Sequence, residues 1–383
     1  MSAVDCKVEI GIDDSGIVWT DISSYVQTVQ ITRGRSRQLD YFSSGTATIT
    51  LKNASRTFDP LNEDSPFYPD ITPRCLMRVS SNTKFLFTGF VNDWDLSYDI
   101  ANQDIASAYC SDVFTILANQ QLRAFTPSTQ LTGARVNTVL ARSGVNFTGT
   151  KSVSTGLSTL GNYAVPANTN VLNYLRQVER SELGSLFVSA NGTLIFRERG
   201  EIPSTPILQF SDDGTDIPYL SLDNQFGDEL LYNYVITDSP AGSEEIKSDA
   251  TSIAKYQTSQ LNWSDLLNSS TTEVASIAQT ILSRYKNPKV RFTGFSVQIL
   301  GLSSAHKSSV LAAELTDFVE LTKSFAQGTP SSVMQLSVIS GIRHDIRPGS
   351  HVISFTVENA EAYLFLILGD SFAGRLDFGQ LDF

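Results

Sequence analysis

Gly45-Thr-Ala-Thr-Ile-Thr-Leu-Lys52 alternates strictly between polar and apolar side chains, and this stretch indicates the fold class. In an extended chain Ala47, Ile49 and Leu51 fall on one face, and the threonines and the final lysine fall on the other. The segment 351–358 repeats this alternation near the other end of the chain. Thr and Val are abundant and turn residues recur at short intervals, so we predict antiparallel barrels or sandwiches.

A second pattern relates the two ends of the chain. Thr88–Trp94 and Ser340–Ile346 both read as hydroxyl, Gly, apolar, two variable positions, Asp, apolar. The internal Gly89 is typical of a bulge or bend in a strand. A duplicated unit would leave such a trace, and it predicts equivalent strand positions for Asp93 and Asp345. Chance similarity between two strands is the alternative.

Helical patterns are few. From Val274 to Tyr285, apolar residues recur at helical spacing, with Ser270 and Glu273 as a capping box and Pro288 as a stop. This predicts a helix over 272–286. Shorter helices are predicted near residues 111–119 and 134–142.

A helix-and-hairpin unit is predicted in the middle of the chain. Its helix runs from about Asn170 to Leu183, with Gly184 as the C′ residue, and the hairpin follows at residues 186–196. Asn191-Gly192 fits a type I′ turn. We expect one apolar face of the helix to pack on this hairpin through Leu172, Leu175 and Val178.

Composition excludes several classes of protein. The 383 residues include 28 Lys or Arg and 40 Asp or Glu, so the net charge is 28 − 40 = −12. This acidic balance argues against specific binding to nucleic acid, which needs clustered basic residues. No stretch approaches the ~20 apolar residues of a membrane span, and we expect a soluble intracellular product. Cys6, Cys75 and Cys110 are odd in number and widely spaced, which indicates neither a disulfide framework nor a zinc site.

The residues that catalysis requires are scarce. His306, His344 and His351 are the only histidines, and the last two, both expected on strands, would point to opposite faces if that strand is continuous. Asp212–Asp216 and Asp13–Gly16 are interpreted as turns rather than metal sites. Gly369-Asp-Ser371 lacks the surroundings of an esterase nucleophile, since no Asp-x-x-His follows it. We therefore predict no enzyme, no cofactor and no metal.

One long segment, Arg33–Pro60, is more distinctive than its composition, and the pattern extends through Ser65–Pro69 and Leu86–Val91. It resembles the opening domain of minor tail proteins from long-tailed, non-contractile bacteriophages. The resemblance continues, with less pattern over 211–270, through residues 171–199, 278–288 and 366–378.

The resemblance implies a fold and a division of the chain. The fold is mainly β with a small α/β insertion, and comprises two tail-tube-like antiparallel β-barrels plus smaller helix-and-hairpin domains. The expected divisions are a first barrel at 1–120, a small α/β domain at 121–210, a mixed connecting region at 211–290 and a second barrel at 291–383.

The function that the resemblance implies is structural. The chain would form the trimeric hub of the tail tip or baseplate, joining the sixfold tail tube to the threefold tip and lining the DNA channel. Its expected partners are itself, the distal tail protein, the tape measure protein and tip or receptor-binding proteins. It would be made in the host cytoplasm and reside in the virion. The alternatives are a hexameric distal tail adaptor and a carbohydrate-binding tip protein.

A proline-rich aromatic loop is the candidate contact with a neighbouring protein. A rigid loop loses little conformational entropy on binding, which suits a docking surface. The alternative is that the loop packs over its own barrel. The candidate contact residues are Phe58, Asp59, Pro60, Pro66, Phe67, Tyr68 and Pro69.

Overall fold

The computed structural model describes residues 4–13, 16–101, 103–145, 147–201 and 206–360. The predicted turn at Asp13–Gly16 lies partly outside these residues. Gly369-Asp-Ser371 and the segment 366–378 lie wholly outside them. Within the described residues the fold is mainly β with a few helices, which confirms the predicted class.

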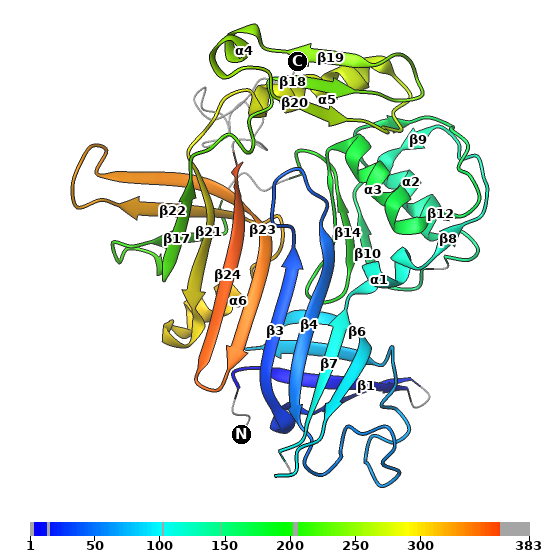
Figure 1. Cartoon of the computed structure of the whole chain (residues 1–383), viewed down its shortest axis with the longest axis vertical. Coiled ribbons are helices and arrows are strands. Elements are labelled where there is room, and N and C mark those ends of the chain that lie inside the picture. The colour runs from blue at the N-terminus through cyan, green and yellow to red at the C-terminus, as the bar shows by residue number, and fades with distance from the viewer. Residues whose placement is uncertain (1–3, 14–15, 102, 146, 202–205, 361–383) are drawn as a thin grey trace.

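One continuous 14-stranded sheet dominates the fold (Figure 1). The mainly β class is therefore correct, but the described strands do not close into two barrels. Among these described strands, the end strands of neither set pair with each other, and β3 pairs instead with β23 of the other strand set. The sheet is also mixed rather than antiparallel, since β15 pairs in parallel with both β16 and β22. The N-terminal strands are β1 (Lys7–Asp13), β2 (Ile17–Asp21), β3 (Val26–Gly34), β4 (Ser43–Lys52), β5 (Leu76–Ser81), β6 (Lys84–Ser97) and β7 (Ile105–Ser111). The C-terminal strands are β15 (Leu208–Ser211), β16 (Ile217–Pro218), β17 (Ser221–Gln225), β21 (Arg291–Gln298), β22 (Phe318–Ser324), β23 (Ser332–Arg347) and β24 (Ser350–Asn359).

Five strands in each half have the same order and direction. The N-terminal order β3-β4-β7-β6-β5 is matched by β17-β21-β24-β23-β22, and every neighbouring pair in both sets is antiparallel. Both sets also carry a β-bulge in the equivalent long strand, at Asn92 in β6 and at Ser340 in β23. The structure thus contains an internal repeat of five strands.

The register of the repeat differs from the one predicted. Aligning the bulges makes Gly341 the counterpart of Asp93, so the predicted equivalence of Asp93 and Asp345 is wrong. Gly89 precedes the bulge of its strand and Gly341 follows the bulge of its strand, so the two glycines meet different neighbours. A Cβ at Gly89 would lie 2.3 Å from the Ser111 carbonyl oxygen, whereas one at Gly341 would lie 3.0 Å from the carbonyl oxygen of Arg35.

The two strand sets meet where β3 pairs with β23. Residues 341–346 of β23 lie antiparallel to residues 29–34 of β3. Arg35 and Glu358 stabilise this junction through two parallel hydrogen bonds of 2.8 Å between guanidinium and carboxylate, both largely buried. The apolar side chains of both sets form one continuous core on one face of the sheet, which makes the two sets a single packed unit.

The middle module has its own core and matches the predicted helix-and-hairpin unit. Asn170 caps α3 by accepting from the Asn173 amide at 3.0 Å, and the apolar face of α3 packs with the hairpin. Two details differ: Leu183 rather than Gly184 takes the left-handed conformation, and only Gly192 of the turn has a positive φ, so the turn is not type I′. The helices are α1 (Val113–Ala118), α2 (Thr132–Leu140) and α3 (Val171–Glu182). The strands are β8 (Gln121–Leu122), β9 (Gln130–Leu131), β10 (Lys151–Val153), β11 (Thr159–Leu160), β12 (Thr169–Asn170), β13 (Ser185–Val188) and β14 (Leu194–Arg197).

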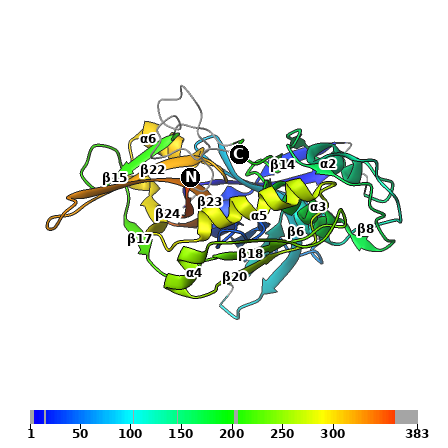
Figure 2. The same cartoon turned by 90° about the horizontal axis from the view of Figure 1, so that it is seen from above.

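A second small module is inserted between β17 and β21. Its helix α5 crosses above the large sheet (Figure 2) and buries its predicted apolar stripe. Ser270 caps α5 as predicted, whereas Glu273 turns instead to the Thr159 amide and the Asn268 side chain. The module comprises β18 (Tyr234–Thr237), β19 (Glu245–Ser248), α4 (Ala250–Tyr256), β20 (Gln260–Trp263) and α5 (Thr271–Tyr285), and α6 (Ser304–Leu311) follows β21.

Candidate interaction surfaces

The proline-rich loop between β4 and β5 divides into buried and exposed side chains. Phe58, Asp59 and Phe67 are buried, so these three predicted contact side chains face the protein interior. Phe58 stacks on Phe67 at 5.5 Å and on Trp94 at 6.1 Å between ring centroids. These contacts anchor the loop to its own strand set.

The outer side of the same loop remains available to a neighbour. Of the predicted residues, Pro60, Pro66, Tyr68 and Pro69 are exposed, and the adjacent Leu61 is 80% exposed. Asp59 supports the loop from inside, since it accepts from the Leu61 amide at 2.9 Å and from Arg56 Nε at 2.7 Å. The contact prediction therefore concerns the exposed side chains.

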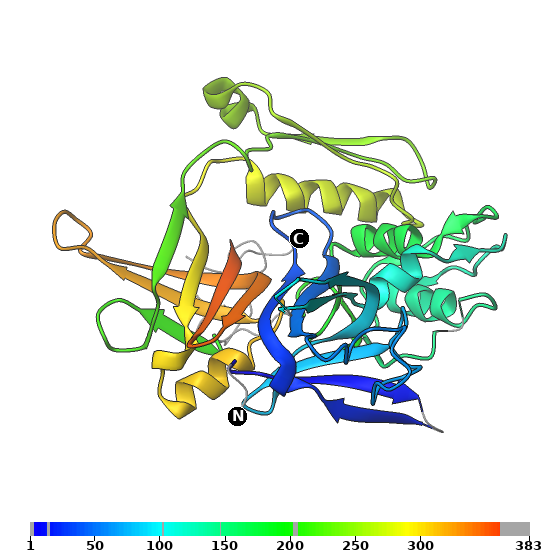
Figure 3. The same cartoon turned by 60° about the horizontal axis from the view of Figure 1, so that its bottom comes forward.

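Two hairpins extend from the body and carry exposed apolar side chains. The β1–β2 hairpin projects at the bottom of the molecule (Figure 3) and exposes Ile17 and Val18. The β22–β23 hairpin projects on the opposite side (Figure 1) and exposes Phe325 and Met334. Exposed apolar tips of this kind are typical of contacts with other proteins.

The face of the large sheet opposite the core is mostly polar over β3, β4 and the strand segments beside them, whereas at β22 and the first half of β23 it carries the buried Phe318, Leu336 and Val338. Thr46, Thr48 and Thr50 of β4 lie on it, and the cross-strand register continues this face through both strand sets. Lysine and arginine are interspersed with acids there, so this face has no continuous basic track for a phosphate backbone. The charged side chains on this face include Lys52, Asp93, Asp95, Asp223, Arg291, Arg343, Asp345 and Arg347.

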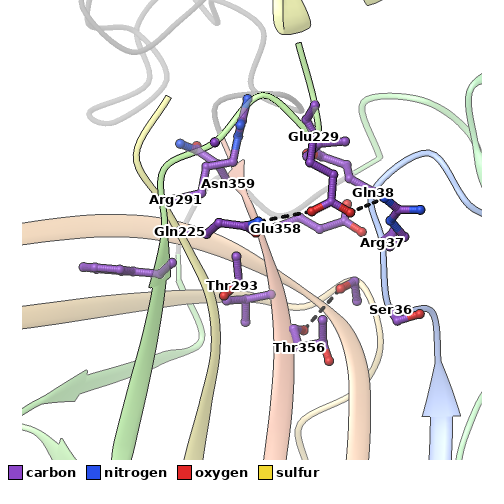
Figure 4. Close-up of a pocket in the computed structure, with 15 residues that line it drawn as sticks. Ser36, Arg37, Gln38, Gln225, Glu229, Arg291, Thr293, Thr356, Glu358 and Asn359 are labelled. Carbon is purple, nitrogen blue, oxygen red and sulfur yellow. Dashed lines mark hydrogen bonds and ion pairs between the residues drawn. The ribbon is translucent and has the colours of Figure 1, made fainter. Parts of the chain in front are cut away.

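A pocket of about 120 Å³ lined by both charged and apolar side chains lies where the two strand sets and the second module meet (Figure 4). Arg37 pairs with Glu229 across it, and Gln225 Nε2 donates to the same carboxylate at 3.1 Å. The hydrogen bond from Arg37 lowers the pKa of Glu229. Its two acids, Glu229 and Glu358, are paired with Arg37 and Arg35, and neither His nor Cys is among the described residues that line the pocket.

The segment that carries the two strand histidines is not one continuous strand, so the condition under which they would point to opposite faces is not met. They lie on the adjacent strands β23 and β24, and His344 Nδ1 is 3.2 Å from His351 Nε2. His351 Nδ1 in turn lies 3.4 Å from Asp5, whose carboxylate binds Lys307. Burial lowers the pKa of both histidines. Because both rings are buried, this network cannot reach a substrate and acts on stability.

Within the described residues, no group of three or more His, Cys, Asp or Glu side chains is arranged to hold a metal ion. In the same part of the chain, no helix is long and apolar enough to cross a membrane. Desolvation raises the pKa of Cys75 to about 11, so this partly buried thiol is not an activated nucleophile.

Comparison with known proteins finds similar structures. No protein-family model matches the sequence, and no curated protein matches it. A tail protein from Neisseria meningitidis MC58 superposes with a TM-score of 0.65 at 10% identity, covering 94% of this chain and 98% of that one. The 43 kDa tail protein of prophage MuSo2 from Shewanella oneidensis gives 0.62 at 12% identity, covering 94% and 99%. Prophage tail protein gp18 from Listeria monocytogenes EGD-e gives 0.52 at 10%, covering 92% and 94%.

These similarities extend over nearly the whole of each chain, so they concern the complete arrangement of the sheet and both modules. The internal repeat, the middle module and the inserted module together make up this arrangement. The predicted resemblance to bacteriophage tail proteins is confirmed at the level of the fold, and the chain has the fold of phage tail proteins.

Proposed function

We propose that the protein is a structural component of a bacteriophage tail and forms the trimeric hub of the tail tip or baseplate. The observation that carries the proposal is the repeat of five strands in the same order within one chain. Three chains with two repeats each provide six similar units around a ring. Such a ring would match a sixfold tail tube on one side and a threefold tip on the other.

The polar face of the sheet supports a role as the wall of the DNA channel. Hydroxyl groups and charges of both signs would allow the duplex to pass, since attraction to phosphate requires clustered basic residues. The net charge of −12 adds to this effect. The wall thus consists of β3, β4, β6, β7, β17, β21, β23 and β24.

The remaining surfaces suit partners in the tail. The exposed side of the proline-rich loop and the two projecting hairpins are the surfaces for the distal tail protein, the tape measure protein and the tip or receptor-binding proteins. The protein has no catalytic role in this proposal. It is made in the host cytoplasm and resides in the virion.

Counting copies in assembled tails tests the proposal. Purified virions are digested, and peptides of this protein are quantified against isotope-labelled standards, with the major capsid protein as internal reference. Three copies per tail support the hub. Six copies would contradict the hub and support the adaptor, and absence from the virion would contradict both.

A further inference from the structure

Two segments of the large sheet have one side that no described strand pairs with. Beyond its bulge, residues 93–97 of β6 pair with β7 on one side, while β5 pairs only with residues 84–90 on the other. Similarly, β17 pairs with β21 alone. Figure 1 places β17 and β6 toward opposite sides of this part of the sheet. A strand edge of this kind offers backbone donors and acceptors for another strand.

The internal repeat identifies what these edges correspond to. In the repeat, β6 is the counterpart of β23, and β17 is the counterpart of β3. The counterparts β23 and β3 pair with each other inside the chain, and they do so through residues beyond the same bulge. The chain thus contains one complete junction between repeats and the two halves of a second junction.

The register of the complete junction can be transferred to the two halves. Aligning β6 on β23 at the bulge, and β17 on β3 through their pairing with β21 and β4, matches β17 to β3 residue by residue. The one irregularity is in β21, where Thr293 forms a bulge opposite Asp223 and Asn224 and is an extra residue relative to β4. For example, Arg343 lies opposite Thr32 in the complete junction, and this pair maps to Asp95 and Gln225. The transferred pairs are Asp93 with Gly227, Trp94 with Phe226, Asp95 with Gln225, Leu96 with Asn224, Ser97 with Asp223 and Tyr98 with Leu222.

This register satisfies a test that a one-residue shift would fail. Trp94, Leu96 and Leu222 are partly buried and contact the core cluster. Asp95 and Gln225 instead lie on the polar face, as do their counterparts. Each transferred pair joins two core-side or two polar-side residues, whereas a shift by one residue would exchange the faces.

Exposed apolar side chains concentrate at the same two edges. The exposed fraction is 57% for Tyr98, 63% for Leu220 and 70% for Phe226. In the transferred register Phe226 lies opposite Trp94, and Tyr98 lies opposite Leu222. Cross-strand pairs of aromatic and large apolar side chains stabilise sheets. The acidic Asp93, Asp95 and Asp223 oppose the pairing, so it should strengthen as salt screens their repulsion.

We propose that residues 93–98, which are the end of β6 and the residue after it, pair in this register with residues 222–227 in a second copy of the chain. Residues 222–227 comprise most of β17 and the two residues after it, and the pairing is antiparallel. This inference rests on the proposed hub, because it specifies the surface through which its copies join. Repetition around three chains alternates internal and intermolecular junctions and closes a ring of six repeats.

Disulfide trapping in assembled tails tests the register. Phage carrying Asp95→Cys together with Gln225→Cys are oxidised mildly, and their proteins are separated on non-reducing gels. Directly opposed residues have Cα atoms about 4.5–5.5 Å apart, within reach of a disulfide. The matched positive control is Thr32→Cys with Arg343→Cys, which should join within one chain. The negative control is Asp95→Cys with Ser221→Cys, about 13 Å out of register at 3.3 Å per residue.

The expected result is a covalent trimer for the 95/225 pair, with no larger species and no cross-link for the 95/221 pair. Three copies per tail without a 95/225 cross-link, while the 32/343 control joins, would overturn the proposed edge and leave the hub intact. A covalent hexamer would support the edge and overturn the trimeric hub. Equal thermal melting of the isolated variants and the parent controls for folding.

Discussion

Replacing Phe58 by alanine should strongly destabilise the N-terminal strand set. Phe58 has no exposed surface and contacts Tyr25 at 5.2 Å, Phe67 at 5.5 Å and Trp94 at 6.1 Å between ring centroids. Phe→Ala substitutions in cores typically cost about 3–5 kcal/mol, from lost transfer free energy and from the cavity left behind. Because Phe58 loses contacts with three aromatic partners, we expect a cost in the middle of that range or above it, at least about 4 kcal/mol.

Urea denaturation followed by tryptophan fluorescence measures this effect, since Trp94 reports on the same cluster. The matched control is Leu61→Ala, in the same loop but 80% exposed, which should change the free energy of unfolding by less than about 0.5 kcal/mol. If Phe58→Ala lost less than about 1 kcal/mol, the loop would not be anchored by its aromatic cluster. The assignment of its inner and outer sides would then be wrong.

Three further predictions concern the middle module, the histidines and the loop surface. Leu175 is fully buried in α3, so Leu175→Ala should lower the free energy of unfolding, measured by urea denaturation, by about 2–4 kcal/mol. A loss no larger than that caused by Asn173→Ala, at an exposed position of the same helix, would contradict the packing. Burial lowers the pKa of His344 and His351, so the stability from keeping them neutral is complete above about pH 6.5 and is lost as the pH falls below it. Thermal melts from pH 8 to 5 should therefore fall more steeply for the parent than for a His344→Gln, His351→Gln variant, and parallel curves would refute this. The double variant Leu61→Asp, Tyr68→Asp should fold normally but form no complete tails in electron micrographs, because it places charges on the exposed side of the loop. The control Glu63→Gln should form complete tails. Complete tails in the double variant would show that the loop is not part of an interface.

The sequence predicted the elements whose pattern is set by burial on one face. Residues 45–52 and 351–358 became β4 and β24 because half of their side chains enter the core. The helices α3 and α5 were predictable for the same reason, since each presents one apolar stripe to a core. The spacing of apolar residues in the sequence, every second residue in a strand and every third or fourth in a helix, reflects which side chains are buried.

What could not be predicted depends on pairing over long distances. The edge strand β17, Ser221–Gln225, has little apolar alternation because most of its side chains are exposed. Phe58 and Phe67 looked like docking residues, because composition does not distinguish a buried aromatic ring from an exposed one. The sequence signal for the contact between His344 and His351 is Pro348-Gly349. This turn separates β23 from β24 and so brings the two rings together.

The 16-residue strand β23 has a consequence for how a ring of repeats could form. Its first half pairs with β22 and its second half with β3, so a single uninterrupted strand joins both repeats. Half of the junctions are thereby formed during folding, at a rate independent of protein concentration, and only the other half require molecules to meet. In the proposed ring of three chains, the equilibrium concentration of rings would depend on the third power of the free chain concentration, whereas six separate units would give the sixth power. Because different residues form the two kinds of junction, substitutions can change the stability of the internal junction and the timing of the intermolecular junction independently.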